Sequence, residues 1–201
     1  MAQPDFSPSA ERNKHPILER LQALVPAQGH ALEIASGTGQ HVCWFAQHMP
    51  DWTWQPTEVH RGALYNIEVR AAEAGLDNVL EALQLDVCRE PWTMEPAGFD
   101  LVLCINMLHI APWEACGALM RGSTKALNAQ GLLITYGPYF EDGVVPLPSN
   151  QEFDQSLRTH DPSWGIRTVA AVQDEAQAAG LRLQARIDMP ANNLLLVWAK
   201  A

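Results

Sequence analysis

A glycine-rich turn is the first feature of the sequence whose residue types suit ligand binding. Residues 32–41 read LEIASGTGQH, which places Gly37 and Gly39 between an expected strand and an expected helix. Glycine lets the backbone approach a ligand closely, and the following helix N-terminus adds N–H donors. A dinucleotide-binding turn would carry a third glycine at position 42, where this chain has Val42. The turn therefore favours a nucleoside ligand without phosphates, while a tight strand-to-helix connection stays open as the other explanation.

Two carboxylates follow at positions that suit a nucleoside. Glu58 lies 19 positions after Gly39 (58 − 39), beyond an expected strand, where an acidic side chain can accept hydrogen bonds from both ribose hydroxyls. Asp86 lies in the tripeptide LDV at the end of the next expected strand, placed to accept from an adenine amine. The structural alternatives are a solvated loop carboxylate at 58 and a helix or turn cap at 86.

Asn106 and His109 follow a fourth expected strand, in the segment CINMLHIAP. Ligands of open parallel sheets bind beyond the carboxyl ends of the strands, so the four strand ends should converge on one crevice. His109 is the first candidate for a general base there, and Asp154 is the second. For the histidine the alternative is packing against the ligand or a loop carbonyl, and for the aspartate it is an exposed place on a short helix.

Strands and helices must alternate to position these residues. Short apolar runs rich in β-branched and aromatic residues alternate with segments of helical period, which predicts an α/β fold with a Rossmann-like, mostly parallel sheet. The seven expected strands are residues 30–35, 52–55, 79–85, 99–105, 132–136, 181–187 and 194–199. The expected helices are residues 9–24, 40–48, 62–74, 113–127 and 168–179. Only a few residues separate the last two strands, so we expect a C-terminal antiparallel hairpin.

One long connection, residues 137–167, contains four prolines and a single helix signal. That signal is the capping box formed by Ser149 and Glu152, which predicts a short helix over 153–158. Long connections of this kind are usually functional lids or binding surfaces. We therefore expect one domain over residues 1–201 with a substrate lid at 137–167.

Composition and charge exclude several classes of protein. The chain has 201 residues, 47% of them hydrophobic, and a net charge of −10 without a basic run, which argues against nucleic-acid binding. Neither a secretory leader nor an apolar run of membrane-spanning length is visible, so we expect a soluble cytoplasmic protein with no membrane partner. Four irregularly spaced cysteines, without a C-x-x-C pair, predict reduced and mostly buried thiols and no metal site.

The chain resembles class I S-adenosylmethionine-dependent methyltransferases, and among them the family of methyltransferase-like protein twenty-six, long catalogued as a domain of unknown function. The matching stretches cover nearly the whole chain: residues 11–14, 33–41, 54–56, 85–87, 104–107, 133–139, 149–150, 153–154, 164–165 and 188–193. Two departures are Thr57-Glu58 in place of Ser-Asp, and Thr168 in place of an aspartate. The resemblance implies the fold and S-adenosylmethionine as cofactor, but no particular acceptor.

Site residues follow from the motifs and the resemblance together. The expected cofactor-binding residues are Arg12, Asn13, Glu33, Ser36, Gly37, Gly39, His41, Glu58, Asp86, Val87 and Asn106. Of these, Arg12 or Asn13 can meet the methionine carboxylate, with ordinary surface contact as the alternative. The expected acceptor-binding residues are Tyr136, Tyr139, Asn150, Phe153, Arg158, Trp164 and Asn192. Aromatic faces among a few polar groups suit a planar nitrogen heterocycle, although lid packing alone explains the same cluster.

The resulting hypothesis is an enzyme that methylates a nitrogen or oxygen atom of a small molecule. A non-catalytic module that binds S-adenosylmethionine and regulates a partner is the alternative. A nicotinamide dehydrogenase is disfavoured because the third glycine and a separate substrate domain are missing. The sequence leaves the acceptor, the methylated atom, the use of a general base and the oligomeric state open.

Overall fold

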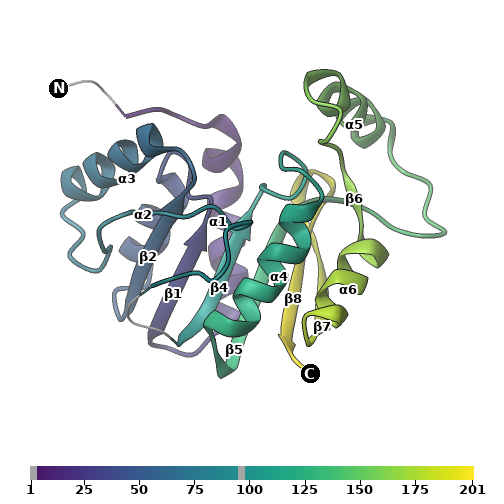
Figure 1. Ribbon diagram of the computed structural model, residues 1–201. Coiled ribbons are helices and arrows are strands. Elements are labelled where there is room, and N and C mark those ends of the chain that lie inside the picture. The colour runs from purple at the N-terminus through teal and green to yellow at the C-terminus, as the bar shows by residue number, and fades with distance from the viewer. Residues whose placement is uncertain (1–3, 95–97) are drawn as a thin grey trace.

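A computed structural model describes residues 4–94 and 98–201 as strands and helices in alternation (Figure 1). The strands are β1 (Gly29–Ile34), β2 (Trp52–Glu58), β3 (Leu83–Gln84), β4 (Phe99–Ile105), β5 (Leu127–Phe140), β6 (Arg167–Thr168), β7 (Leu181–Met189) and β8 (Asn193–Lys200). The helices are α1 (Pro8–Leu24), α2 (Gln40–His48), α3 (Arg61–Glu73), α4 (Glu114–Ala126), α5 (Pro148–His160), α6 (Val169–Ala178) and a 3-10 turn η1 (Pro190–Asn192). None of the described helices combines the length and apolarity that a membrane span requires.

The central sheet has the order β3-β2-β1-β4-β5-β8-β7. Strands β3 to β5 along this path run parallel, with Leu32 of β1 paired to Gln55 of β2 on one side and to Val102 of β4 on the other. β8 is antiparallel to both β5 and β7, as Tyr136 opposite Leu195 illustrates. The predicted α/β class, the mostly parallel sheet and the C-terminal antiparallel hairpin are all confirmed.

The edge of the sheet departs from the prediction at residues 79–85. Ladder pairing there is limited to the two residues of β3 and an isolated bridge between Val79 and Trp54. Pro56 of β2 has no N–H to donate to a neighbouring strand, and the side chain of Gln55 donates to the Glu81 carbonyl at 2.8 Å instead. The proline thus shortens the strand. A further two-residue strand, β6, pairs with the end of β5 and was not anticipated.

Two apolar clusters hold the sheet between its helices. Successive residues of β1 point to opposite faces, so Ala31 enters one cluster and Leu32 the other. On the first face, fully buried Trp54 packs with side chains of α1, α2 and α3; on the second, fully buried Trp198 packs with α4 and α6. Each such side chain contributes about 1.5–3 kcal/mol by leaving water. The sheet is therefore a rigid platform whose carboxyl ends are free to carry a site.

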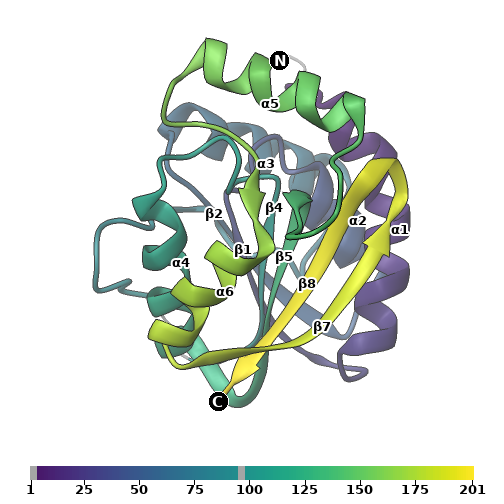
Figure 2. The ribbon, with the colours of Figure 1, turned by 90° about the vertical axis from the view of Figure 1, so that its right-hand side faces the viewer.

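Helix α5 is longer than predicted and begins differently. Its N-cap is Leu147, Pro148 occupies the first turn, and no side chain caps it. Proline fits that position because its φ is preset and its missing N–H is not needed there. The helix therefore starts one residue before Ser149, so the predicted capping box is wrong and the helix spans 13 residues. Figure 2 shows α5 lying across the carboxyl ends of the parallel strands.

Candidate functional site

The glycine-rich turn has a backbone conformation that favours glycine. Gly37 and Gly39 both have positive φ, 55° and 73°, and Gly39 is the N-cap of α2. A Cβ added at Gly39 would lie 2.9 Å from the Cα of Ile67, so only glycine lets α3 approach so closely. Ala35 also has positive φ, at 56°, a strained conformation for a residue with a Cβ that its sequence did not signal.

Glu58 joins this turn to the end of β2. Its Oε2 accepts from the N–H of Gly37 at 3.0 Å, and its Oε1 accepts from the N–H groups of Val59 and His60 at 2.8 and 3.3 Å. The N–H of Ser36 also donates to a carbonyl of β2, that of Thr57, at 2.8 Å. The turn and the carboxylate are thus joined by hydrogen bonds, a contact that the sequence did not indicate; the role of Glu58 at a ribose stays a prediction. The alternative of a solvated loop carboxylate is wrong, since Glu58 is only 7% exposed.

Glu33, at the end of β1, is a buried carboxyl group. Among the residues that the structure describes, neither of its carboxyl oxygens has a hydrogen-bond partner, and the hydroxyl of Ser36 donates to the backbone carbonyl of Glu33 at 3.4 Å. Burial raises the pKa of Glu33 to about 8, and the negative charge of Glu58 adds to the effect. A buried polar group without a partner costs free energy, so this carboxyl group suits a ligand that brings a donor or a positive charge.

The first residues of α2 bind helix α1 to the turn. Gln40 accepts from the N–H of Ser7 and donates to Glu11 at 3.2 Å. His41 Nε2 lies 2.7 Å from Asn13 Oδ1. Burial lowers the pKa of His41 to about 4, and Lys14 adds to the effect, so the neutral ring donates to this oxygen. The Gln40 contact was missed by sequence reasoning, although the motifs at 11–14 and 33–41 contain both partners.

Asp86 and Val87 follow β3 beside Glu58, since the N–H of Leu85 donates to the Glu58 carbonyl at 3.0 Å. Asp86 accepts from the N–H of Cys88 at 3.0 Å, which is the turn-cap role left open above. Its carboxylate stays half-exposed and lies 3.4 Å from Arg89. Val87 is buried in the second apolar cluster. The strand end therefore presents one accessible acceptor next to the turn.

A large cavity of about 1010 Å³ opens beside this unit, at the carboxyl ends of β4 and β5. Eight of the predicted residues line it: Arg12, Asn13, Asn106, His109, Tyr136, Asn150, Phe153 and Asn192. The start of α1, helix α5 and the turn between β7 and β8 form its walls, and the side-chain amide of Asn150 donates to the Asn192 carbonyl at 3.3 Å. We refer to this space as the large cavity.

His109 lies in the wall of the large cavity and is 7% exposed. Burial lowers its pKa to about 4, and the Arg167 charge adds to the effect, so the imidazole is neutral at pH 7. A Cβ on Gly137 would lie 3.3 Å from His109 Nδ1 and 3.7 Å from Asn106 Oδ1, so this glycine leaves room for both side chains. Asn106 itself has a φ of 60°, outside the ordinary strand conformation.

Arg167 is a supporting residue that sequence reasoning missed. It donates to the carbonyls of Leu108 and Ala111 at 3.0 and 2.8 Å, on either side of His109 in the chain. The loop that carries the histidine is thereby fixed from the far end of the 137–167 connection. The sequence contains this arginine in the motif Trp164-Gly165-Ile166-Arg167, which differs from the family pattern at the next residue, but the motif did not indicate a partner for it.

Four of the residues predicted to act in catalysis or acceptor binding do not line the large cavity. Tyr139 lies three positions after Tyr136 on β5, so it points to the opposite face of the sheet and enters the second apolar cluster. Asp154 accepts from Arg158 Nε at 2.8 Å and from the N–H of Ile166 at 2.7 Å, which commits both side chains to holding α5. Trp164 stacks on His160 with ring centroids 5.8 Å apart. The interpretation of the aspartate as a general base and of the other three as acceptor contacts is therefore not supported by their positions.

Comparison with known proteins assigns the chain to a family. Residues 4–200 match the family described as "Protein of unknown function (DUF938)". The chain belongs to the DUF938 family.

Several solved structures share the DUF938 fold seen in this chain. CalO1, a methyltransferase in calicheamicin biosynthesis in its SAH-bound form, superposes with a TM-score of 0.78 at 18% identity over 96% of this chain and 54% of its own. The mitomycin 7-O-methyltransferase MmcR has a TM-score of 0.79 at 18% identity, over 92% of this chain and 53% of its own. The S-adenosylmethionine-dependent methyltransferase SibL has a TM-score of 0.78 at 20% identity, over 96% of this chain and 55% of its own. The DUF938 chain thus has the fold of class I methyltransferases and spans about half the length of these neighbours.

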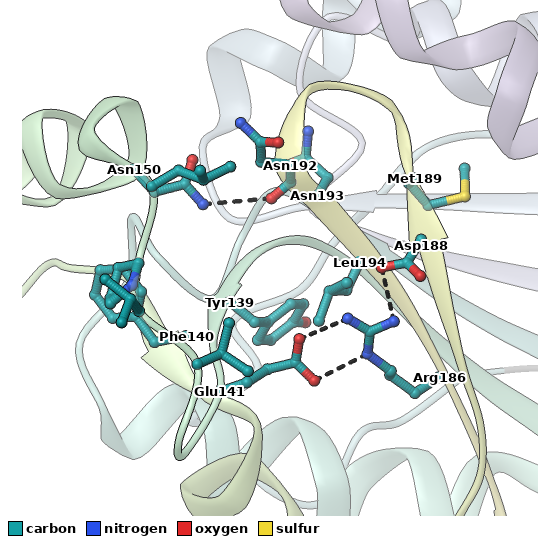
Figure 3. A pocket seen from close by; sticks show the side chains of 14 residues that line it. Tyr139, Phe140, Glu141, Asn150, Arg186, Asp188, Met189, Asn192, Asn193 and Leu194 are labelled. Atoms are coloured by element: carbon teal, nitrogen blue, oxygen red, sulfur yellow. Dashed lines mark hydrogen bonds and ion pairs between the residues drawn. The ribbon is translucent and has the colours of Figure 1, made fainter.

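A small cavity of about 320 Å³ lies on the other side of the β7–β8 turn of this DUF938 protein. Figure 3 shows Arg186 there between Glu141 and Asp188, with Tyr139 beside them. Arg186 binds both oxygens of Glu141 and lies 2.7 Å from Asp188, so its charge is compensated. Within residues 4–94 and 98–201 no group of three His, Cys, Asp or Glu side chains is arranged to hold a metal. Three of the predicted acceptor-binding residues, Tyr139, Asn150 and Asn192, line this small cavity, although the sequence did not indicate a second cavity.

Proposed function

We propose that the chain is an S-adenosylmethionine-dependent methyltransferase that acts on a small molecule. The observation that carries the proposal is the connection between the glycine-rich turn and the large cavity. Asn13 lines the cavity and accepts from His41, which lies on α2, the helix that has Gly39 of the turn as its N-cap. A ligand in the turn and a second ligand in the cavity would therefore lie side by side, as a two-substrate transfer requires.

The residues of the turn fit the cofactor. The unpartnered carboxyl group of Glu33 suits the ammonium group of the methionine end, Glu58 is placed for the ribose, and Asp86 offers its accessible oxygen to the adenine amine. Three backbone N–H groups already occupy the Glu58 carboxylate, so ribose binding would use the remaining acceptor capacity or replace one of these bonds. The cofactor supplies a methyl group activated on a sulfonium, so the protein needs to bind, orient and exclude water.

His109 is the residue we assign to the acceptor's proton. The neutral imidazole of this buried residue can accept a proton, although its lowered pKa makes it a weak base. A weak base suits an acceptor that is already acidic, such as a phenolic hydroxyl or a ring nitrogen. General base catalysis of this kind contributes about 10²–10⁴-fold.

The large cavity supports an enzyme over a non-catalytic binding module. A module that only bound the cofactor would need no space on the acceptor side, whereas here about 1010 Å³ is lined by Phe153, Tyr136 and several asparagine amides. An aromatic face among hydrogen-bonding groups suits a planar nitrogen heterocycle, which we retain as the acceptor. We also retain one domain with a lid at 137–167, the relation to the methyltransferase-like protein twenty-six family and a cytoplasmic location.

Calorimetry and a labelled-methyl assay together test the proposed function. S-adenosylmethionine and its demethylated product should bind, and NAD should not, because the turn lacks the third glycine of a dinucleotide site. An extract of small molecules incubated with isotope-labelled methyl donor should then yield labelled products by mass spectrometry. Binding without any labelled product would support the regulatory module, and binding of NAD alone would overturn the proposal.

A further inference from the structure

The large cavity differs in charge from the rest of the molecule. The chain carries 23 Asp and Glu residues against 13 Lys and Arg. Yet the 17 described residues that line the large cavity include no carboxylate and a single cation, Arg12. The other polar groups in the lining are hydroxyls, amides and the His109 ring. Such a lining disfavours a cationic ligand, because no group in it compensates a positive charge.

Acidic residues lie close in the chain to the lining of the large cavity, but their carboxylates are not part of it. Five of them lie within two positions of a lining residue: Asp5, Glu11, Glu152, Asp154 and Asp188. Three of the five pair with a cation that is also outside the lining: Glu11 with Lys14 at 2.6 Å, Asp154 with Arg158 at 2.8 Å and Asp188 with Arg186 at 2.7 Å. The described lining therefore lacks negative charge although acidic residues neighbour it in the sequence.

Arg12 keeps most of its donors available. Its guanidinium makes one hydrogen bond, to the hydroxyl of Ser9 at 3.3 Å, in the part of the chain that the structure describes. No described carboxylate lies within ion-pair distance of it. A guanidinium presents a planar fork of donors that matches a carboxylate with two parallel hydrogen bonds.

Tyr136 offers a second donor to the same cavity. Tyr136 is a buried residue of the lining. A phenolic hydroxyl has one proton that it can donate to a ligand.

We propose that the methyl acceptor is a small organic acid whose carboxylate is bound in the large cavity by Arg12 and the Tyr136 hydroxyl. The inference rests on the proposed function, and it assigns Arg12 to the acceptor and not to the methionine end of the cofactor. The carboxylate is the recognition group, so the methylated atom lies elsewhere on the same molecule. Phe153 supplies an aromatic face against which the planar ring of such an acceptor can stack.

Matched acid and amide pairs test the charge requirement directly. Benzoate and benzamide, nicotinate and nicotinamide, and indole-3-acetate and indole-3-acetamide are titrated by calorimetry into protein saturated with S-adenosylhomocysteine. In at least one pair the acid should bind about 10–100-fold more tightly than the amide, the range for a hydrogen-bonded charge. Arg12→Gln should remove this preference and Tyr136→Phe should reduce it. Arg20→Gln, an exposed arginine on the same helix, should leave it unchanged.

The variants separate this inference from its alternatives. Equal binding of acid and amide in every pair, or no binding of any acid at millimolar concentration, would overturn it. A loss of S-adenosylhomocysteine affinity in Arg12→Gln, with the acid preference retained, would place Arg12 at the cofactor. If the wild-type protein does not bind S-adenosylhomocysteine, the proposed function fails, and the same titrations on the protein alone still decide whether the cavity selects carboxylates.

Discussion

The two halves of the candidate site are built in contrasting ways. Around the glycine-rich turn, backbone groups and buried side chains of α1, α2 and β2 are joined by a dense set of hydrogen bonds centred on Glu58 and Gln40. On the acceptor side, α5 buries only Leu157 and is held by Asp154 and a few exposed polar contacts. If the proposed function holds, the cofactor half is the more rigid one and the acceptor half is loosely attached, which would allow one ligand to be fixed while the other enters and leaves.

The largest effect is expected at Glu33, in the rigid half. Its folded-state pKa, about 8, lies above the ordinary 4.5, so between these values the folded protein binds more protons than the unfolded chain. The free energy of unfolding should therefore be highest below about pH 4.5 as far as this group is concerned, and fall by a few kcal/mol as pH rises through about 8.

Urea denaturation at several pH values checks this dependence. Glu33→Gln should flatten the decline between pH 5 and 8, because the amide does not titrate. Glu19→Gln, an exposed position on α1, should reproduce the wild-type slope. An identical slope in wild type and Glu33→Gln would show that the buried carboxyl group is not the source.

Removing the Glu58 carboxylate should weaken cofactor binding, an effect smaller in free energy than the one expected at Glu33. Glu58→Ala leaves the N–H groups of Gly37, Val59 and His60 without an acceptor and removes the ribose contact, so affinity for S-adenosylhomocysteine should fall roughly 10–100-fold. Calorimetry measures the dissociation constant. Glu68→Ala, exposed on α3, is the matched control, and an unchanged constant in Glu58→Ala would remove this residue from the cofactor site.

In the acceptor half, Phe153 and Trp164 should behave differently although both belong to the 137–167 connection. Phe153 lines the large cavity beside His109, with ring centroids 5.6 Å apart, whereas Trp164 stacks on His160 away from it. Phe153→Ala should weaken acceptor binding about 5–10-fold through the lost aromatic contact, with cofactor affinity retained. Trp164→Ala should change acceptor binding less. The KM for the acceptor measures both effects once the acceptor is known. A larger rise of KM in Trp164→Ala than in Phe153→Ala would contradict the assignment of the large cavity to the acceptor.

The sequence predicted one half of the site better than the other, because the contacts of the first half are local in the chain and those of the second are not. The turn could be anticipated because positive φ at Gly37 and Gly39 and the carboxylate at Glu58 are encoded by local motifs. The residues that line the acceptor half could not be predicted, because they depend on which face of β5 each side chain takes and on partners far along the chain. The prediction for Tyr139 failed because this side chain lies on the other face of β5 from Tyr136.

The second of these, long-range pairing, explains the remaining errors. Asp154 had the residue type of a base, yet a backbone N–H twelve positions away occupies its carboxylate. Arg167 fixes the loop of His109 from more than 50 positions away, a contact that no local pattern indicates. Likewise, the edge strand expected at residues 79–85 is shorter because Pro56 of the neighbouring strand has no N–H to donate, and the side chain of Gln55 donates to the Glu81 carbonyl instead.

The smallest expected effect on overall stability, and the sharpest test of the contrast, is at Asp154. Its carboxylate joins α5 to Ile166 and Arg158, but the Arg158 side chain is half-exposed and the helix contributes one buried residue to the protein. Asp154→Asn should therefore lower the free energy of unfolding by no more than about 1 kcal/mol. It should nevertheless raise amide hydrogen exchange across residues 148–160 several-fold, because local opening of α5 costs little beyond these contacts. Glu152→Gln, exposed on the same helix, should change neither quantity, and an increase in exchange that extends to β1 and β2 would mean that the two halves open together and that the acceptor half is not independent.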